Sequence, residues 1–233
     1  MGDPSPGMPA RNGTVGHLED NATIEYRHEV VRKAIHMCSL SIPIVYYFIS
    51  KDTALLILIP LTTAFLVVDI ARHYSEPVSR WFYSWFGWLL RKHEQDGSSK
   101  RLSGATNVLL SACFCVLVFP KVIAINAFAV LIVSDTTSAL IGRRFGKRKF
   151  FHKSLEGSLA FFLSAVVVIL LAPKIDRLPA EYLIGVAASA IGAIVEAVSS
   201  RVDDNISIPI SIGLAMWVLY WLLLPSVDLL RLA

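Results

Sequence analysis

The stretch IVSDTTSALIGRRFGKRKFFHKSLEG, residues 132–157, joins two apolar segments through a basic loop that contains two glycines. Its first part places Asp135 among apolar residues, and its last part becomes apolar again after Ser154. A charged side chain within an apolar helix is costly, so such a residue marks a functional site with a nearby partner. The stretch therefore predicts two membrane helices and, beside the loop that connects them, a site for an anion.

The composition of the whole chain indicates an integral membrane protein. Its 233 residues are 55% hydrophobic and 17% charged, and the mean hydropathy is +0.58, which is too apolar for a typical soluble domain. The net charge of +4 is explained by the lysine and arginine that membrane proteins keep in cytoplasmic loops. We therefore expect a lipid bilayer, and no nucleic acid, as the environment of this chain.

Seven apolar segments approach the length of about 20 residues that a helix needs to cross a bilayer. They lie at residues 30–50, 53–71, 104–119, 122–141, 155–172, 182–199 and 206–224. The sequence thus predicts an all-α, polytopic membrane helix bundle with about seven transmembrane helices. A single transmembrane catalytic domain is expected over residues 26–233, after a flexible cytoplasmic tail at residues 1–25.

Lysine and arginine are distributed unevenly among the connections between these segments. Every second connection, starting with the N-terminal tail, belongs to a group that holds 17 of the 22 Lys and Arg residues, and the other group holds five. The positive-inside rule then places the N-terminus in the cytoplasm and the C-terminus outside. The expected location is the plasma membrane of a bacterium or archaeon, or the endoplasmic reticulum of a eukaryote, with the site facing the cytoplasm.

Residues 81–90, WFYSWFGWLL, are dense in aromatic side chains and are flanked by Arg80, Arg91 and Lys92. Tryptophan and tyrosine favour the headgroup level of a bilayer. We therefore expect one amphipathic helix along the cytoplasmic interface, which either anchors the chain or guides a lipid towards the site.

Acidic residues occur near the cytoplasmic ends of three predicted helices. They are Asp69, which lies three residues before Arg72, then Asp135, and then Glu196. A cation near a helix end often serves only as an anchor, but the positive-inside rule accounts for no acid. Three helices that each carry a carboxylate on one side predict a shared polar cavity.

Carboxylates, cations and a helix N-terminus together suit a triphosphate that is bound through a divalent metal. Gly142 and Gly146 allow a tight basic loop that includes Arg143. Lys153 can reach phosphate, and Ser154 is a candidate N-cap for a helix whose N–H groups face an anion. A basic loop by itself is more typical of membrane topology or of anionic-lipid binding, so the prediction depends on the whole set of residues.

Six motifs occur in an order that resembles one enzyme family. They are RKAIH at residues 32–36, DIAR at 69–72, SGAT at 103–106, SDTTSALIGRRFG at 134–146, KSLEG at 153–157 and DDNISIP at 203–209. They are similar to motifs of the CTP-dependent lipid-alcohol kinases, which include dolichol kinase, phytol kinase and the yeast-type diacylglycerol kinase. The resemblance implies transfer of the γ-phosphoryl group of CTP, with Mg²⁺ or another divalent cation, to the hydroxyl of a membrane lipid such as diacylglycerol, a polyprenol, dolichol or phytol.

This resemblance, together with the chemistry of phosphoryl transfer, gives each residue an expected role. Asp135 is expected as general base or metal ligand, and Lys153 and Glu196 are expected beside it in the catalytic centre. The expected metal ligands are Asp69, Asp135, Asp203 and Asp204. The expected nucleotide or phosphate contacts are Arg32, Lys33, His36, Arg72, Thr106, Gly142, Arg143, Gly146, Ser154 and Asn205.

Two other functions stay open at this point. A phosphatidate cytidylyltransferase-like enzyme also joins CTP to a lipid, and the KSLEG motif at residues 153–157 is shared in kind with that group. A transporter also carries charges within membrane helices, but secondary transporters place them near the midplane and often contain inverted repeats. In this chain the charges cluster on one side of the membrane, which favours the kinase.

Overall fold

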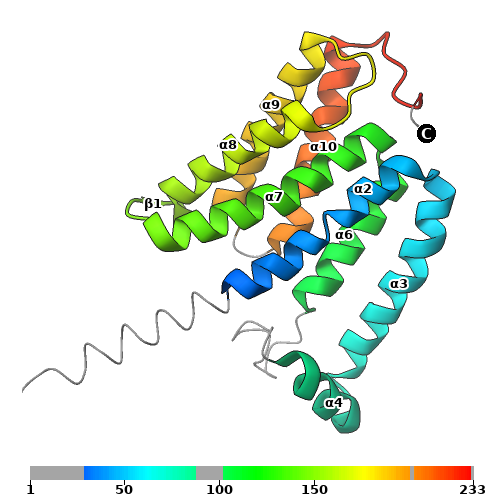
Figure 1. Ribbon diagram of the computed structural model, residues 1–233, viewed down its shortest axis with the longest axis vertical. Coiled ribbons are helices and arrows are strands. Elements are labelled where there is room, and N and C mark those ends of the chain that lie inside the picture. Colours follow the sequence, from blue (N-terminus) through cyan, green and yellow to red (C-terminus); the bar gives the residue numbers. More distant parts are fainter. Residues whose placement is uncertain (1–28, 88–101, 200–201, 232–233) are drawn as a thin grey trace, which may run out of the picture.

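The computed structural model describes residues 29–87, 102–199 and 202–231 of the protein. Helices dominate these residues (Figure 1). Residues 29–38 are helical. The further helices are α2 (Ser41–Phe48), α3 (Lys51–Ala71), α4 (Glu76–Phe86), α6 (Gly104–Val118), α7 (Lys121–Phe145), α8 (Leu155–Leu171), α9 (Pro179–Val198) and α10 (Asp204–Leu223).

The predicted apolar segments coincide with helices, which confirms the helical architecture. Four helices, α3, α7, α9 and α10, are long and apolar enough to cross a membrane. Helices α6 and α8 are also apolar but have only 15 and 17 residues. The number of seven spans therefore stays a prediction, and the predicted tail at residues 1–25 lies outside the described residues.

The first apolar segment, expected as one span over residues 30–50, is divided into two helices. Residues 39–40 form a turn, in which the N–H of Ser39 donates to His36 O at 2.9 Å and that of Leu40 to Met37 O at 3.0 Å. Pro43 explains the break, because it has no N–H to donate to the Ser39 carbonyl and its ring would clash with that carbonyl in a regular helix. The prediction of one continuous span is wrong here.

The all-α class is confirmed apart from one small hairpin among the described residues, and the basic loop expected around Gly142 and Gly146 begins later than predicted. Helix α7 continues to Phe145, and Arg143 and Arg144 in its last turn stabilise the negative end of the helix dipole. The next residues form a hairpin of β1 (Lys149–Phe150) and β2 (Lys153–Ser154). Its strands pair antiparallel, with Lys149 opposite Ser154 and Phe150 opposite Lys153. The fold is thus a helix bundle with one small hairpin.

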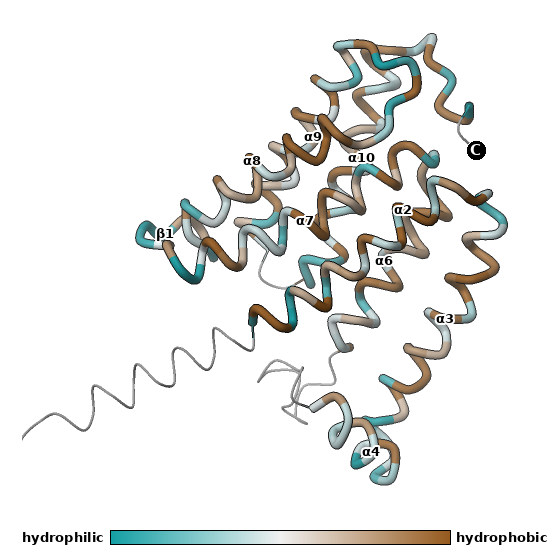
Figure 2. Tube along the Cα trace, viewed as in Figure 1, coloured by the Kyte–Doolittle hydropathy of each residue, from teal (hydrophilic) through white to brown (hydrophobic). Residues whose placement is uncertain are grey.

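Helix α7 lies at the centre of the bundle, where it packs against α2, α8 and α10 (Figure 1). Helix α3 lies at the edge and packs mainly on α6. Hydrophobic residues occur along most of the helices, and hydrophilic residues are concentrated at the hairpin (Figure 2). Side chains such as Leu56 and Val67 of α3 are 76% and 59% exposed. Exposed apolar surface of this extent is typical of contact with a membrane or partner, and it agrees with a membrane protein.

Helix α4 contains the first part of the predicted interfacial segment but begins earlier, at Glu76, with Pro77 in its first turn. Its side chains are divided between two faces. Phe82 is buried, whereas Trp81 and Trp85, four residues apart, are 52% and 66% exposed. The amphipathic character of this helix is therefore confirmed, while residues 88–90 lie outside the described residues.

The end of the bundle that holds the α8–α9 connection contains two buried charged side chains, Lys174 and Glu181, which are hydrogen-bonded separately. The ammonium of Lys174 donates to Ile169 O at 2.6 Å and to Ala172 O at 2.9 Å, at the C-terminus of α8. The carboxylate of Glu181 accepts three backbone N–H groups of the connection, at 2.9 to 3.0 Å, and the hydroxyl of Tyr220 at 3.0 Å. Both side chains thus complete the backbone hydrogen bonds of a connection.

We expect Gly213→Ala to destabilise the bundle. A Cβ at this position of α10 would lie 2.4 Å from Cε2 of the buried Phe119 ring. Overpacking of a core typically lowers the free energy of unfolding by about 1–3 kcal/mol. The control is Gly104→Ala, because a Cβ there meets no atom within 4 Å. Thermal unfolding in detergent, followed by circular dichroism, measures both; equal stability of the two variants would contradict the close contact.

Candidate functional site

Asp135 lies in α7, ten residues before the helix ends at Phe145. The residue is only 6% exposed and forms an ion pair with Lys33, which is 4% exposed and belongs to the helical residues 29–38. His36, one turn after Lys33, brings its Nε2 to 3.8 Å from Asp135 Oδ2. A buried charge needs a partner, so the partner that the sequence predicted for Asp135 is present and is Lys33.

Lys153 joins two further carboxylates. Its Nζ lies 2.8 Å from Oδ2 of Asp204, at the start of α10, and 3.3 Å from Oε1 of Glu196, near the end of α9. Lys33, Asp135, Lys153, Glu196 and Asp204 are called the central cluster below. They come from the helical residues 29–38, α7, β2, α9 and α10, so residues far apart in the sequence meet at one end of the bundle.

Neighbouring carboxylates keep the Lys153 ammonium protonated. Burial acts to lower the pKa of its ammonium, but the negative charges of Asp204, Glu196 and Asp135 outweigh burial, and the pKa is raised above its ordinary value. Its side chain is nevertheless 32% exposed, whereas those of Glu196 and Asp204 are 1% and 19% exposed. Lys153 is therefore a permanent cation that an anion from outside can reach.

Helices α7 and α8 pack closely where the hairpin connects them, and this contact fixes the position of the hairpin and of Lys153. A Cβ at Gly157 would lie 3.2 Å from the Cα of Gly142 and 3.0 Å from Oγ of Ser154. Ser154 caps α8, as the sequence predicted, and its Oγ accepts from Gly157 N at 3.1 Å. A Cβ at Gly146 would meet Gly142 O at 2.2 Å. Both predicted loop glycines thus allow close backbone packing, and their contact with a nucleotide stays a prediction.

Asp69 and Arg72 form a second set of contacts, between α3, α4 and α6. Nε of Arg72 donates to Asp69 Oδ1 at 2.5 Å, and the backbone N–H of Ser103 donates to Asp69 Oδ2 at 2.6 Å. The Arg72 guanidinium also lies over the Phe82 ring, 4.7 Å from its centroid. These contacts tie the end of α3 to the start of α6. The fully buried Thr106 belongs here, with Oγ1 3.1 Å from Ser103 Oγ. Metal or nucleotide binding by these residues stays a prediction.

Arg32 and Arg143 share a carboxylate that the sequence analysis did not identify. Arg32 forms an ion pair with Glu29, and NH2 of Arg143 lies 3.1 Å from Glu29 Oε2. Glu29 is 3% exposed, while the Arg143 side chain is 49% exposed. The contact joins the helical residues 29–38 to the last turn of α7. In the sequence, the position of Glu29 three residues before Arg32 was the signal for an ion pair within one helix turn.

Asp203 and Asn205 shape the start of α10. Oδ1 of Asp203, the N-cap, accepts from the backbone N–H of Asn205 at 2.9 Å and from its Nδ2 at 2.7 Å. The Oδ1 of Asn205 is buried, and no donor among the described residues reaches it. Asp203 therefore orients the residue beside Asp204, and its expected role as a metal ligand stays a prediction.

Ser138 and Ser158 are two further polar residues of the site that the sequence analysis did not identify. Oγ of Ser138 donates to Glu196 Oε1 at 2.8 Å, and Oγ of Ser158 donates to Glu196 Oε2 at 3.2 Å. Both serines are buried. Ser138 lies one turn after Asp135, and Ser158 lies one turn after the Ser154 cap, so their spacing on the helices was the available signal.

The carboxylates of the site do not form a complete binding site for a divalent metal on their own. Within residues 29–87, 102–199 and 202–231, no group of three or more His, Cys, Asp or Glu side chains is arranged to hold a metal ion. Mg²⁺ at nucleotide sites is usually bound by one or two carboxylates and by phosphate oxygens. The predicted set of four aspartates is not one group. Asp204 contacts Lys153, and Asp135 interacts with the same ammonium electrostatically, so metal binding by these two acids stays a prediction.

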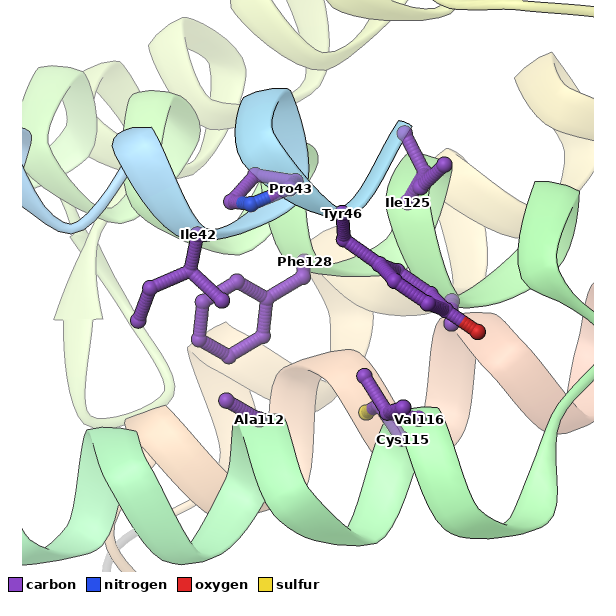
Figure 3. Close-up of a pocket in the computed structure, with 9 residues that line it drawn as sticks. Ile42, Pro43, Tyr46, Ala112, Cys115, Val116, Ile125 and Phe128 are labelled. Atoms are coloured by element: carbon purple, nitrogen blue, oxygen red, sulfur yellow. The ribbon is translucent and has the colours of Figure 1, made fainter. Parts of the chain in front are cut away.

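A narrow recess between α2, α6 and α7 is apolar (Figure 3). Its lining includes Ile42 and Tyr46 of α2, Ala112 and Cys115 of α6, and Phe128 of α7. None of its lining residues belongs to the central cluster. Because its lining holds no charged side chain, we interpret it as a packing gap of the core and place the candidate site at the central cluster.

Comparison with known proteins gives a family for the chain. It is 30% identical, over 204 residues, to a protein of Rickettsia prowazekii (strain Madrid E) that is described as the uncharacterized protein RP860. The match covers 86% of this chain and 99% of the relative. The chain belongs to the family of that protein. No family model matches the chain, and no solved structure matches it.

We expect Lys33→Met to destabilise the protein, because it leaves the Asp135 carboxylate buried without its cation. Removing one partner of a buried ion pair typically costs about 3–5 kcal/mol, whereas replacing both partners by apolar groups is often neutral. The double variant Lys33→Met/Asp135→Leu should therefore recover stability in thermal unfolding experiments.

Arg231→Ala is the control for this experiment. It breaks the exposed pair of Arg231 with Asp176, 2.6 Å apart, and such exposed pairs contribute about 0–1 kcal/mol. If Lys33→Met were as stable as this control, the pair of Lys33 and Asp135 would not be a buried ion pair in the membrane.

Proposed function

We propose that the chain is a membrane lipid-alcohol kinase, which transfers the γ-phosphoryl group of CTP to a lipid hydroxyl at the cytoplasmic face. In this proposal about seven helical segments cross the membrane, the N-terminus lies in the cytoplasm, and α4 lies along the interface. The central cluster carries the proposal, because it combines a buried acid with two lysines and lies at the end of the bundle where the positive-inside rule places the cytoplasm.

One cation and one helix N-terminus of the site support the binding of phosphate. Lys153 is charged and partly exposed, and the hairpin that contains it begins four residues after the end of α7. Ser154 directs the N-terminus of α8 towards the same region, and the N–H groups at a helix start favour an anion. A triphosphate would exchange the contacts of Lys153 with Asp204 and Glu196 for contacts with its own oxygens.

Asp135 is the proposed general base. The alcohol oxygen of the lipid forms a bond to the γ-phosphorus, the bond from that phosphorus to the bridging oxygen of CDP breaks, and Asp135 accepts the proton of the alcohol. For this step its carboxylate must be released from Lys33, which a phosphate can bring about by competing for the same ammonium. CDP leaves with the bridging oxygen, and the lipid leaves as its monophosphate.

A divalent cation fits beside Asp135 and Asp204, with the remaining ligands from the nucleotide. When bound, Mg²⁺ supplies neutralisation of the phosphate charges. Asp69 and Asp203 have structural contacts of their own, at the start of α6 and of α10, and we do not include them in this metal site.

The experiment that tests the function is product analysis with CTP labelled at the γ- or the α-phosphate. Purified protein in detergent is incubated with diacylglycerol, phytol or a polyprenol. We expect CDP and a lipid monophosphate that carries the γ-label. Pyrophosphate and a CDP-lipid that carries the α-label would instead identify a cytidylyltransferase, and no product with any lipid would contradict both enzymes.

Asp135→Asn should reduce the rate of phosphoryl transfer by roughly 100-fold or more, since general base catalysis contributes about 10²–10⁴-fold. Circular dichroism should show that the variant keeps its helices. The control is Asp176→Asn, which changes an exposed acid in the connection between α8 and α9. A rate near that of the unchanged protein would remove Asp135 from the catalytic centre.

Lys153→Ala should raise the KM for CTP by roughly 10- to 100-fold, since a hydrogen bond to a charged group contributes about 1.5–3 kcal/mol. The KM for the lipid should change little. Lys121→Ala, at the start of α7, serves as the control for loss of a lysine. An unchanged KM for CTP in the Lys153 variant would show that Lys153 is not in the phosphate site.

A further inference from the structure

The carboxylate of Glu196 receives hydrogen bonds from two different helices. It is 1% exposed, and its two oxygens accept separately, from Ser138 of α7 at 2.8 Å and from Ser158 of α8 at 3.2 Å. The same oxygen that accepts from Ser138 lies 3.3 Å from Nζ of Lys153. A carboxylate that is bonded at both oxygens has a fixed plane, and so has a fixed direction towards the ammonium.

The direction of these two hydroxyls differs from that of other serines in the bundle. Ser189 in α9 and Ser164 in α8 donate to carbonyls four residues earlier in their own helices, each at 2.8 Å. This is the ordinary bond of a serine within a helix. Ser138 and Ser158 instead donate across helix boundaries to one acid. Their hydroxyls therefore connect elements, whereas those of Ser189 and Ser164 satisfy their own backbone.

Close packing explains why the side chains of Ser138 and Ser158 are small, but it does not explain why they carry a hydroxyl group. Helices α7 and α8 approach closely here, and a Cβ at Gly157 would lie 3.2 Å from Ser138 O. Alanine would satisfy this limit as well as serine does. The hydroxyls are needed only for the buried carboxylate, whose desolvation must be offset by donors.

We propose that Ser138 and Ser158 are positioning residues, which orient Glu196 so that it holds the Lys153 ammonium at the place where a substrate phosphate binds. The proposal deepens the proposed function and rests on it, because it takes Lys153 as a phosphate-binding residue. Neither serine touches the substrate. Asp204, 2.8 Å from Lys153 on α10, holds the other side of the ammonium, so loss of the serines weakens the placement of Lys153 without abolishing it.

The test compares Ser138→Ala, Ser158→Ala and the double alanine variant with the unchanged protein. We expect the KM for CTP to rise about three- to tenfold in each single variant, which is the range for loss of one hydrogen bond. The KM for the lipid alcohol should stay the same. Ser189→Ala is the matched control, since Ser189 is fully buried in the same helix as Glu196, and it should leave both KM values unchanged.

A double-mutant cycle separates positioning from a merely structural role. In a Lys153→Ala background, Ser138→Ala and Ser158→Ala should have no further effect on the KM for CTP, because the residue that they position is gone. Equal effects with and without Lys153 would overturn the proposal. So would single variants whose KM for CTP matches that of Ser189→Ala.

A binding measurement distinguishes failure of this proposal from failure of the kinase function. Binding of Mg²⁺ and inorganic triphosphate, measured as a rise in thermal stability, requires neither a lipid nor phosphoryl transfer. If the unchanged protein binds triphosphate but phosphorylates no lipid, the kinase proposal fails, and a three- to tenfold weaker binding by the serine variants still supports positioning. Equal triphosphate binding by all variants, or no binding by the unchanged protein, overturns the positioning proposal.

Discussion

The buried pairing of Lys33 with Asp135 constrains the rest of the structure. A carboxylate in the most enclosed helix of an apolar bundle is tolerated only if a cation reaches it, and α7 carries no cation beside Asp135. The helical residues 29–38 must therefore lie against α7. The same rule accounts for Lys153, which lies between Glu196 and Asp204, and for Arg72, which lies beside Asp69. The pairs of Lys33 with Asp135 and of Lys153 with Glu196 and Asp204 join different elements, so they restrict how these elements can shift relative to one another.

The buried acids at the two ends of the bundle illustrate two uses of the same chemistry. Glu181 is saturated by backbone N–H groups and by Tyr220, so it completes a connection and has no capacity left for a ligand. Glu196 is held by two serines and faces a lysine that is 32% exposed. An acid that fixes a reachable cation differs from an acid that fixes a backbone, and this difference supports the choice of the central cluster as the site.

The sequence predicts the helices well because apolar runs of this length leave few alternatives. It also predicts that Asp135, Glu196 and Lys153 lie on one side, because charge distribution reports depth in a membrane. It does not predict which cation meets which acid, since that depends on helix rotation and packing: Lys33 reaches Asp135, while Arg32, next to it, reaches Glu29. The break before Pro43 and the hairpin at residues 149–154 were missed because their signals are local and short. Ser138 and Ser158 were missed because a serine in a helix usually bonds its own backbone.

The length of α7 has a consequence for the kind of molecule that can meet Asp135. Its 25 residues span about 37 Å at 1.5 Å per residue, somewhat more than the roughly 30 Å thickness of the hydrocarbon layer. The ten residues after Asp135 correspond to about 15 Å, so in the proposed membrane arrangement its carboxylate lies below the headgroup level on the side of the hairpin. A neutral lipid with one hydroxyl can sink to that depth at little cost, whereas a lipid with a charged headgroup loses its hydration there. In the proposed kinase, this depth therefore favours acceptor lipids without a charged headgroup.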